Sequence, residues 1–391
     1  MYIKKQHCYL SKICFRQKTI KLLIEIFNKY LHYRMIANNR RSYLILFTYF
    51  QVLRVFAQND TLNKVTFSGY GEVYYSYDFS NPANHEKPNF IYNHKRHNEI
   101  NTNLILVKAN YSDQGLRANL GVMAGNYAQY NLSAEPNWAQ FIYEANIGIK
   151  LSNKRNLWLD AGILPSHIGF ESAIGADCWT PTRSIAAENS PYFETGLKIG
   201  YTNRKENLQL AFLILNGWQR IKKPDYIQSP STGFQLNYRA SDKLTLNYSN
   251  FIGTDKADSL NSIRTFHNVY LQYLPTSQVS VLLGFDMGSD KYNMKEYGIW
   301  YTPVLILRYS INDKSSIAMR GEYYMDKRQV LIATNSINGF QVSGVSANVD
   351  HKINRNAIFR IEGKMYSSKD RLFGNAFRAN FSMTTTMSVK F

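Results

Sequence analysis

The stretch FRANFSMTTTMSVKF, residues 377–391, decides the fold. From Phe377 to Phe391 every second residue is apolar or, once, threonine, and the residues between them are polar. A two-residue period indicates a β-strand with one apolar and one polar face. Strands of soluble proteins usually have about five or six residues, whereas a strand tilted through a membrane needs roughly 9–11. We therefore predict that this stretch crosses a membrane as a β-strand.

The same alternation recurs upstream, in residues 157–163, 244–249, 317–324 and 359–365. A Lys or Arg facing lipid at the bilayer midplane costs roughly 2–4 kcal/mol, so the charged positions are expected to face a wet lumen. The charged residues assigned to the lumen wall are Lys198, Arg308, Arg320, Glu322, Arg360, Glu362, Lys364 and Arg378. Because most of them are basic, we expect a modest preference for anions that weakens as salt rises.

Connector lengths predict the number of strands. Seven short polar connectors, near 112–115, 152–155, 202–205, 240–242, 275–277, 312–314 and 354–356, alternate with eight longer ones. This pattern predicts an all-β fold: a transmembrane, antiparallel, up-and-down β-barrel of sixteen strands, with both termini on the periplasmic side. The count carries a margin of two strands because residues 338–352 alternate poorly. Sixteen strands are enough to enclose an aqueous channel.

Composition excludes several other classes. Aromatic residues make up 14% of the 391 residues and charged residues only 19%, below the quarter or so that soluble proteins carry. No apolar run after residue 57 approaches the ~20 residues of a spanning helix. Of the net charge of +18, residues 1–57 contribute +10 (eleven Lys/Arg, one Glu), so residues 58–391 carry only +8. We therefore expect no nucleic-acid partner.

The N-terminal segment has the features of an export signal. Arg40 and Arg41 precede a short apolar run, and cleavage after Ala57 would complete a signal peptide over residues 35–57, starting at Met35. Residues 1–34 are then an upstream-start extension; an amphipathic helix over residues 19–33 is the alternative. The mature barrel would span residues 58–391 and contain a single cysteine, Cys178, so no disulfide is expected.

The longest connector, residues 165–190, is predicted to be an ordered third loop that folds into the lumen. Its charged and titratable residues are the candidates to narrow and charge the pore: His167, Glu171, Asp177, Arg183 and Glu188. The alternative is that Asp177 and Arg183 only pin the loop to the wall. Trp179 is interpreted as a packing anchor.

No catalytic, cofactor or metal site is predicted. His94, His97 and Glu99 have an irregular spacing with no fourth ligand near, and are interpreted as part of a solvated loop. His267 lies in a strand but no Ser-Asn pair follows it, and nucleotide-binding and G-x-S-x-G motifs do not occur in the sequence.

The segment 157–184, LWLDAGILPSHIGFESAIGADCWTPTRS, followed by PYFETGLKIGY (191–201) and LNGWQ (215–219), resembles the OmpL-like β-barrel porin family of Gram-negative outer membranes. The matching positions are Asp160, Ala161, Gly162, His167, Ile168, Gly169, Glu171, Asp177, Trp179, Arg183, Ser184, Thr195, Gly196, Asn216, Gly217 and Trp218. Leu164, Ser166 and Cys178 depart from the family pattern. The resemblance is clear over about residues 66–220, and it implies passive transport.

Two functions remain open. The first is a porin in the outer membrane that passes small hydrophilic solutes or ions; the second is a structural or surface-interaction barrel without significant transport. Charge on the inward faces favours the porin. Expected partners are outer-membrane lipid, the solutes, further copies of the chain in a homo-oligomer, and the barrel assembly machinery, for which the terminal Phe391 is the predicted signal.

Overall fold

The computed structural model describes residues 64–293, 295–334, 336–373 and 377–391. The predicted upstream extension and the signal peptide, residues 1–34 and 35–57, lie outside the described residues. The barrel begins at Val65 and forms one compact unit to Phe391.

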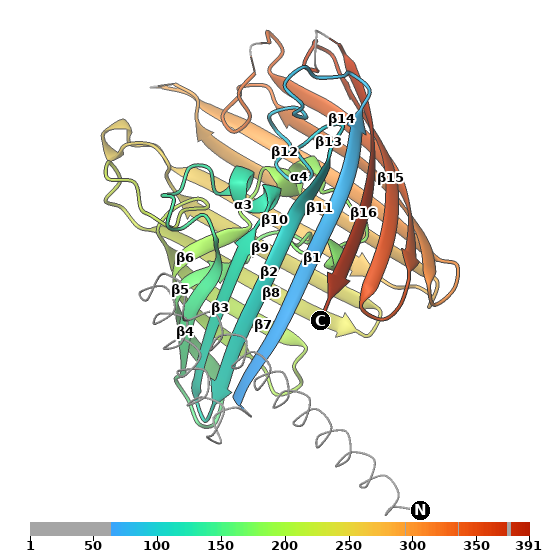
Figure 1. The fold of residues 1–391 in the computed structure, drawn as a ribbon. Coiled ribbons are helices and arrows are strands. Elements are labelled where there is room, and N and C mark those ends of the chain that lie inside the picture. The colour runs from blue at the N-terminus through green and yellow to red at the C-terminus, as the bar shows by residue number, and fades with distance from the viewer. Residues whose placement is uncertain (1–63, 294, 335, 374–376) are drawn as a thin grey trace, which may run out of the picture. The chain divides into compact units, whose positions relative to one another are not determined.

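Sixteen strands form a closed antiparallel barrel in which each strand pairs with its neighbours in sequence and β1 pairs with β16. The strands are β1 (Val65–Asp78), β2 (Ile100–Asp113), β3 (Leu116–Ala124), β4 (Ile142–Lys150), β5 (Asn156–Pro165), β6 (Phe193–Thr202), β7 (Leu208–Leu215), β8 (Ser231–Ser241), β9 (Leu244–Gly253), β10 (Arg264–Tyr273), β11 (Val279–Lys291), β12 (Tyr297–Ser310), β13 (Ser315–Asp326), β14 (Phe340–Lys352), β15 (Ala357–Ser368) and β16 (Ala379–Lys390). Figure 1 shows the strands side by side around one ring. The predicted fold class and strand number are confirmed.

The connections alternate between short turns at one end of the barrel and long loops at the other, as predicted. The turn between β2 and β3 is two residues long, whereas the loop between β5 and β6 spans residues 166–192. In outer-membrane barrels short turns face the periplasm and long loops face outward. The end with the short turns is therefore the periplasmic end, and the end with the long loops is the extracellular end.

Burial alternates along each strand because one face meets lipid and the other the interior. In β16 the apolar side chains of Phe381, Met383 and Met387 are exposed on the outer face, while Thr384 and Thr386 are buried inside. β14 alternates as regularly in burial, although its sequence does not. The reason is that its inward face begins with apolar Phe340 and Val342, which face other apolar groups rather than water.

Much of the interior is packed with apolar side chains, which corrects the expectation of a polar lumen throughout. The first three long loops are residues 79–99, 125–141 and 166–192. One apolar cluster joins inward side chains of β7 to β15 with residues of the first and third loops, including Phe90, Ile185, Phe251, Phe266, Trp300, Tyr324, Phe340 and Tyr366. A second joins β1 to β6 with the second and third loops, including Tyr70, Leu104, Leu106, Tyr127, Leu132, Ala173 and Phe193. Apolar inward positions are thus a scaffold on which the loops fold.

Helical structure among the described residues is confined to connections. It comprises the α-helices α3 (Asn126–Asn131) and α4 (Ile185–Glu188) and the 3-10 turns η2 (Gly175–Asp177) and η3 (Asp258–Leu260). None of these helices, within the described part of the chain, has the length and apolar character needed to cross a membrane.

Candidate functional site

The third loop, residues 166–192, is held inside the barrel by contacts with strands on several sides of the wall. Its helix α4 contacts β12 and β13, and its turn η2 contacts β16. Figure 1 shows α4 within the ring of strands. Nearly all its residues from Thr180 to Glu188 are buried.

His167 attaches the start of the loop to β6 and β9. Its Nδ1 lies 2.8 Å from Oε2 of Glu194 and its Nε2 lies 2.7 Å from the carbonyl oxygen of Asn250. Burial alone would lower the pKa of His167, but the Glu194 carboxylate and the Asn250 carbonyl outweigh burial and raise it. Both ring nitrogens face acceptors, so the doubly protonated imidazolium satisfies this site. Gly233 leaves room for the ring, since a Cβ there would lie 2.6 Å from it.

Arg320 of β13 joins the middle of the loop to the wall. Its guanidinium donates to the Thr180 hydroxyl at 2.7 Å and to the Thr182 carbonyl at 2.8 Å. It also forms ion pairs with Glu362 at 3.1 Å, with Glu322 at 3.3 Å and with Glu171 at 3.5 Å. It donates to the Thr182 hydroxyl as well, at 3.1 Å. A buried arginine that meets three carboxylates and three further loop oxygens is fully committed to structure.

The two acidic wall residues bind the loop backbone in turn. Glu362 accepts from the amide of Thr182 at 2.7 Å, and Glu322 accepts from the amide of Ile185 at 2.5 Å. Backbone groups of a loop inside a barrel need such partners, because an unpaired buried amide is costly. The carboxylates therefore replace the water that an exposed loop would have.

Arg360 and Lys364 of β15 perform the same role for loop carbonyls. Arg360 donates to the carbonyls of Gly175 at 2.9 Å and Cys178 at 3.1 Å while paired with Asp350. Lys364 donates to the carbonyl of Arg183 at 2.8 Å. β15 thus supplies two cationic side chains that donate hydrogen bonds to the loop backbone.

Arg183 lies entirely within the loop and is fully buried. It donates to three loop carbonyls, those of Pro181 at 2.6 Å, Ser172 at 2.7 Å and Ala173 at 3.1 Å. Trp179 packs against the apolar wall of β11 to β13. Both residues hold the loop in shape.

Two more predicted residues also have structural partners. Glu188 accepts hydrogen bonds from the amides of Tyr92 at 2.9 Å and Asn93 at 3.1 Å, and so joins the third loop to the first. Glu171 accepts from the amide of Ser184 at 2.9 Å. The prediction that these charges face the pore is therefore not met: of the five predicted constriction residues, His167, Arg183 and Glu188 are buried and the Glu171 side chain is 2% exposed.

Asp177 is the exposed member of the set. It forms an ion pair of 2.8 Å with Lys390 at the periplasmic end of β16, and both side chains are about half exposed. The charge of Asp177 is therefore in contact with solvent.

The remaining predicted wall residues lie at different depths. Lys198 on β6 and Arg308 on β12 are half-buried and inward-facing in the periplasmic half. Arg308 lines a cavity of about 550 Å³ together with Ser316, Asp350 and Lys352. Arg378 was predicted to lie on the wall, but it precedes β16 and is exposed, so it belongs to the extracellular connection.

Sequence reasoning missed a set of inward acids, and with it the balance of charge. These are Glu72, Glu144, Asp160, Glu194, Asp286, Asp290 and Asp350. Several neutralise basic residues, as Asp160 does Arg117 and Glu144 does Lys108 at 2.6 Å. Each of these acids lies an even number of residues from another inward residue of its strand. The alternation of the strands could therefore have identified them as inward-facing. The expected excess of basic over acidic groups on the wall is wrong.

The first loop also differs from its interpretation. His94 and His97 are buried, not solvated. His94 Nε2 lies 3.4 Å from Glu72, and the amide of Asp78 donates to His97 Nδ1 at 2.8 Å. Among the described residues no group of three His, Cys, Asp or Glu side chains could hold a metal ion.

Comparison with known proteins places this geometry among channels of the outer membrane. The sequence model of the family described as "Putative beta-barrel porin-2, OmpL-like" matches residues 64–391. No protein with curated annotation shows significant sequence similarity to the chain.

Several solved structures share the fold. The anion-selective porin from Comamonas acidovorans is 9% identical, with a TM-score of 0.57 over 84% of this chain and 99% of that one. The Salmonella typhi OmpF complex with daunomycin is 10% identical, with a TM-score of 0.56 over 84% and 97%. The trimer form of Vibrio cholerae OmpT is 10% identical, with a TM-score of 0.54 over 84% and 99%. At these identities the likeness concerns the fold alone.

Proposed function

Since the chain belongs to the OmpL-like β-barrel porin family and is a porin of the outer membrane, we propose that its channel is narrow, and that small hydrophilic solutes or ions pass beside the third loop. The described loop residues meet β1, β6, β9, β13, β15 and β16. The path is therefore restricted by packing rather than by a ring of free charges.

The observation that carries this proposal is the burial of large inward side chains around the loop. Trp300, Arg183, Arg320 and Arg360 are the largest side chains that are less than 2% exposed. A side chain without solvent contact cannot line a wide aqueous channel. The periplasmic half, where Lys198 and Arg308 are half-buried, is the accessible part of the path.

Planar-bilayer recording of the refolded protein tests the proposal. The parent should show a small single-channel conductance, and replacement of residues 172–184 by a short Gly-Ser linker should raise it several-fold. A matched linker that replaces η3, residues 258–260, none of which is buried, should leave conductance unchanged. A folded parent with no conductance would favour the structural or surface-interaction barrel instead, and a large parent conductance would refute the narrow path.

Four further properties belong to the same proposal. We infer that the barrel catalyses no reaction and needs no cofactor, in keeping with its porin family and fold. We also propose that the assembly machinery recognises Phe391 and that the barrel forms a homo-oligomer; the trimer form known for the Vibrio cholerae protein supports the latter. Mass spectrometry of the protein extracted in mild detergent measures the oligomeric state.

A further inference from the structure

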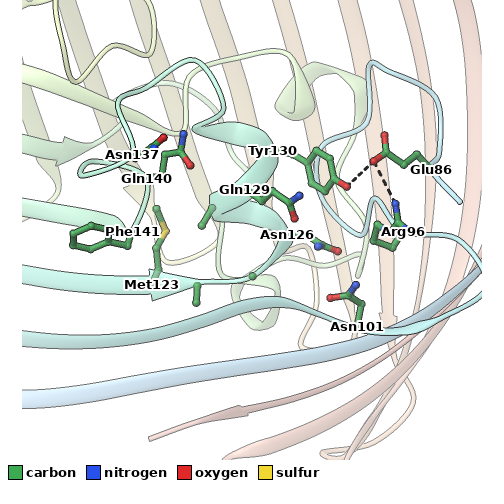
Figure 2. Close-up of a pocket in the computed structure, with 13 residues that line it drawn as sticks. Glu86, Arg96, Asn101, Met123, Asn126, Gln129, Tyr130, Asn137, Gln140 and Phe141 are labelled. Carbon is green, nitrogen blue, oxygen red and sulfur yellow. Dashed lines mark hydrogen bonds and ion pairs between the residues drawn. The ribbon is translucent and has the colours of Figure 1, made fainter. Parts of the chain in front are cut away.

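A cavity of about 640 Å³ opens at the extracellular ends of β2 and β3, around helix α3. Figure 2 shows the side chains that line it, which come from the first loop, β2, β3, α3 and the connection that follows α3. Its volume lies within the range of roughly 300–1,000 Å³ that small-molecule sites occupy. The cavity is separate from the third loop and from the residues assigned to the channel above.

Five amide side chains give this cavity its chemical character: Asn101, Asn126, Gln129, Asn137 and Gln140. Asn126 is only 4% exposed, and its carbonyl oxygen accepts from the hydroxyl of Tyr74. The NH₂ group of Asn126 donates to no other side chain or backbone group within the described residues. This NH₂ group is not enclosed by protein and reaches the surface of the cavity, so a ligand acceptor there can bond to it.

The exposed amides of Gln129 and Asn137 likewise form no side-chain hydrogen bond within the described part of the chain. An amide carries two donors and an acceptor in one plane, so it can bond two neighbouring hydroxyl groups at once. Asn101 donates to Glu99 at 2.6 Å and Gln140 donates to the Glu135 carbonyl at 3.0 Å, so three of the five amides are free. These three match a ligand that is dense in hydroxyls.

The charges at the cavity are already neutralised. Arg96 pairs with Glu86 at 3.3 Å and with Glu99 at 3.0 Å, and the hydroxyl of Tyr130 donates to Glu86 at 2.8 Å. An anionic ligand would find no free cation among these groups, and a cation would meet the arginine. An apolar ligand would leave the amides without partners, which is costly. The ligand that fits is neutral and polar.

Two aromatic rings complete the site. Phe141 is 51% exposed and Tyr130 is half-buried, and both line the cavity. A pyranose ring has hydroxyls on its rim and apolar C–H groups on its faces, which pack against aromatic rings. We propose that this cavity binds a neutral saccharide, a binding site beyond the porin function. The sugar is either a free oligosaccharide or the neutral part of a glycolipid headgroup in the outer leaflet.

Binding measurements on the full chain in detergent micelles test the site. One arm applies the protein to an array of neutral glycans and measures the affinity of the best one by calorimetry; a second arm titrates purified lipopolysaccharide. Asn126→Leu and the double variant Gln129→Ala with Asn137→Ala should each weaken binding roughly tenfold, the effect of one or two lost hydrogen bonds. Gln114→Ala, an exposed amide in the turn between β2 and β3, is the matched control and should bind like the parent.

Weakening of glycan binding in both variants supports the proposal, and weakening confined to the lipopolysaccharide arm supports it with the outer leaflet as the source. The proposal is overturned if the parent binds in neither arm, or if the double variant, whose exposed positions leave folding unaffected, binds as tightly as the parent. Single-channel conductance should be the same in all these proteins, so this test and that of the narrow channel fail independently.

Discussion

Arg320 is the residue on which attachment of the third loop depends most. Its replacement by methionine would leave Glu171, Glu322 and Glu362 close together without their shared cation. Breaking a buried ion pair from one side typically costs about 3–5 kcal/mol. We expect Arg320→Met to lower the free energy of unfolding by about that amount, measured by urea titration of the refolded barrel. Arg355→Met, in the exposed turn between β14 and β15, is the control and should change it little.

At the residue scale, Phe391 extends the pairing of β1 with β16, the two strands that close the barrel. Its amide donates to the Gly69 carbonyl at 3.0 Å, the Gly69 amide donates back at 2.8 Å, and the aromatic ring covers Gly69, where any Cβ would overlap it. An aromatic ring over a glycine in a neighbouring strand strengthens the pairing of the two strands.

We therefore expect deletion of Phe391 to lower the amount of folded barrel in the outer membrane, and Gly69→Val to do the same by displacing the ring. Heat-modifiable mobility in gel electrophoresis of membrane fractions measures the folded amount. Phe381→Ala, which removes a lipid-facing ring from the same strand, should have a smaller effect. Normal folded levels without Phe391 would contradict an assembly role.

At the scale of the loop as an element, we expect His167 to make the attachment sensitive to pH. Its pKa is raised in the folded state, so its stabilising effect is complete below the ordinary pKa of about 6.5 and is lost as pH rises through the raised value. Once the proton leaves, either Glu194 or the Asn250 carbonyl loses its donor, at a cost of about 1–3 kcal/mol. The positive charge of Lys198 on β6 disfavours the protonated form of His167, and the negative charge of Glu194 favours it.

We expect the conductance of the parent channel to rise, or to fluctuate more, as pH increases through the raised pKa of His167, because the start of the loop is released. Recordings between about pH 6 and pH 9 measure this change. His167→Gln cannot titrate in this range and should give a flat profile. A parent profile as flat as that of the variant would show that His167 does not control the loop.

At the scale of the whole molecule, ion preference depends on charges that have no partner. Arg320, Arg360 and Lys364 are paired with carboxylates, whereas Lys198 and Arg308 form no ion pair within the described residues; Arg308 contacts the Ser316 hydroxyl at 3.2 Å. The accessible path is therefore still expected to favour anions modestly at low salt, and less at high salt.

Reversal potentials across a salt gradient measure this preference. Lys198→Glu and Arg308→Glu should each shift it toward cations, whereas Arg378→Glu in the extracellular connection should shift it less. Arg183→Glu would not report selectivity cleanly, because it breaks three hydrogen bonds that hold the loop and should raise conductance instead. Cation preference in the parent would mean that the inward carboxylates dominate the path.

The number, direction and closure of the strands could be predicted from the sequence alone. Alternation, as in residues 377–391, and turn composition, as in residues 112–115, are local properties, and a membrane allows few solutions to an alternating chain. The resemblance around residues 157–218 identified the family for the same reason, since it lies in a contiguous stretch. The third loop was recognisable by its length.

What the charged residues do was decided by the tertiary structure. Arg320 lies on β13, Glu362 on β15 and Glu171 in the loop, and only closure of the barrel brings them together. In the sequence, inward apolar residues such as Trp300 and Phe251 interrupt the polar face of their strands. The structure shows that they pack against one another and against loop residues. A charged side chain on an inward face meets either water or a charged partner. Which of the two it meets depends on contacts between residues far apart in the chain, and a sequence pattern does not show those contacts.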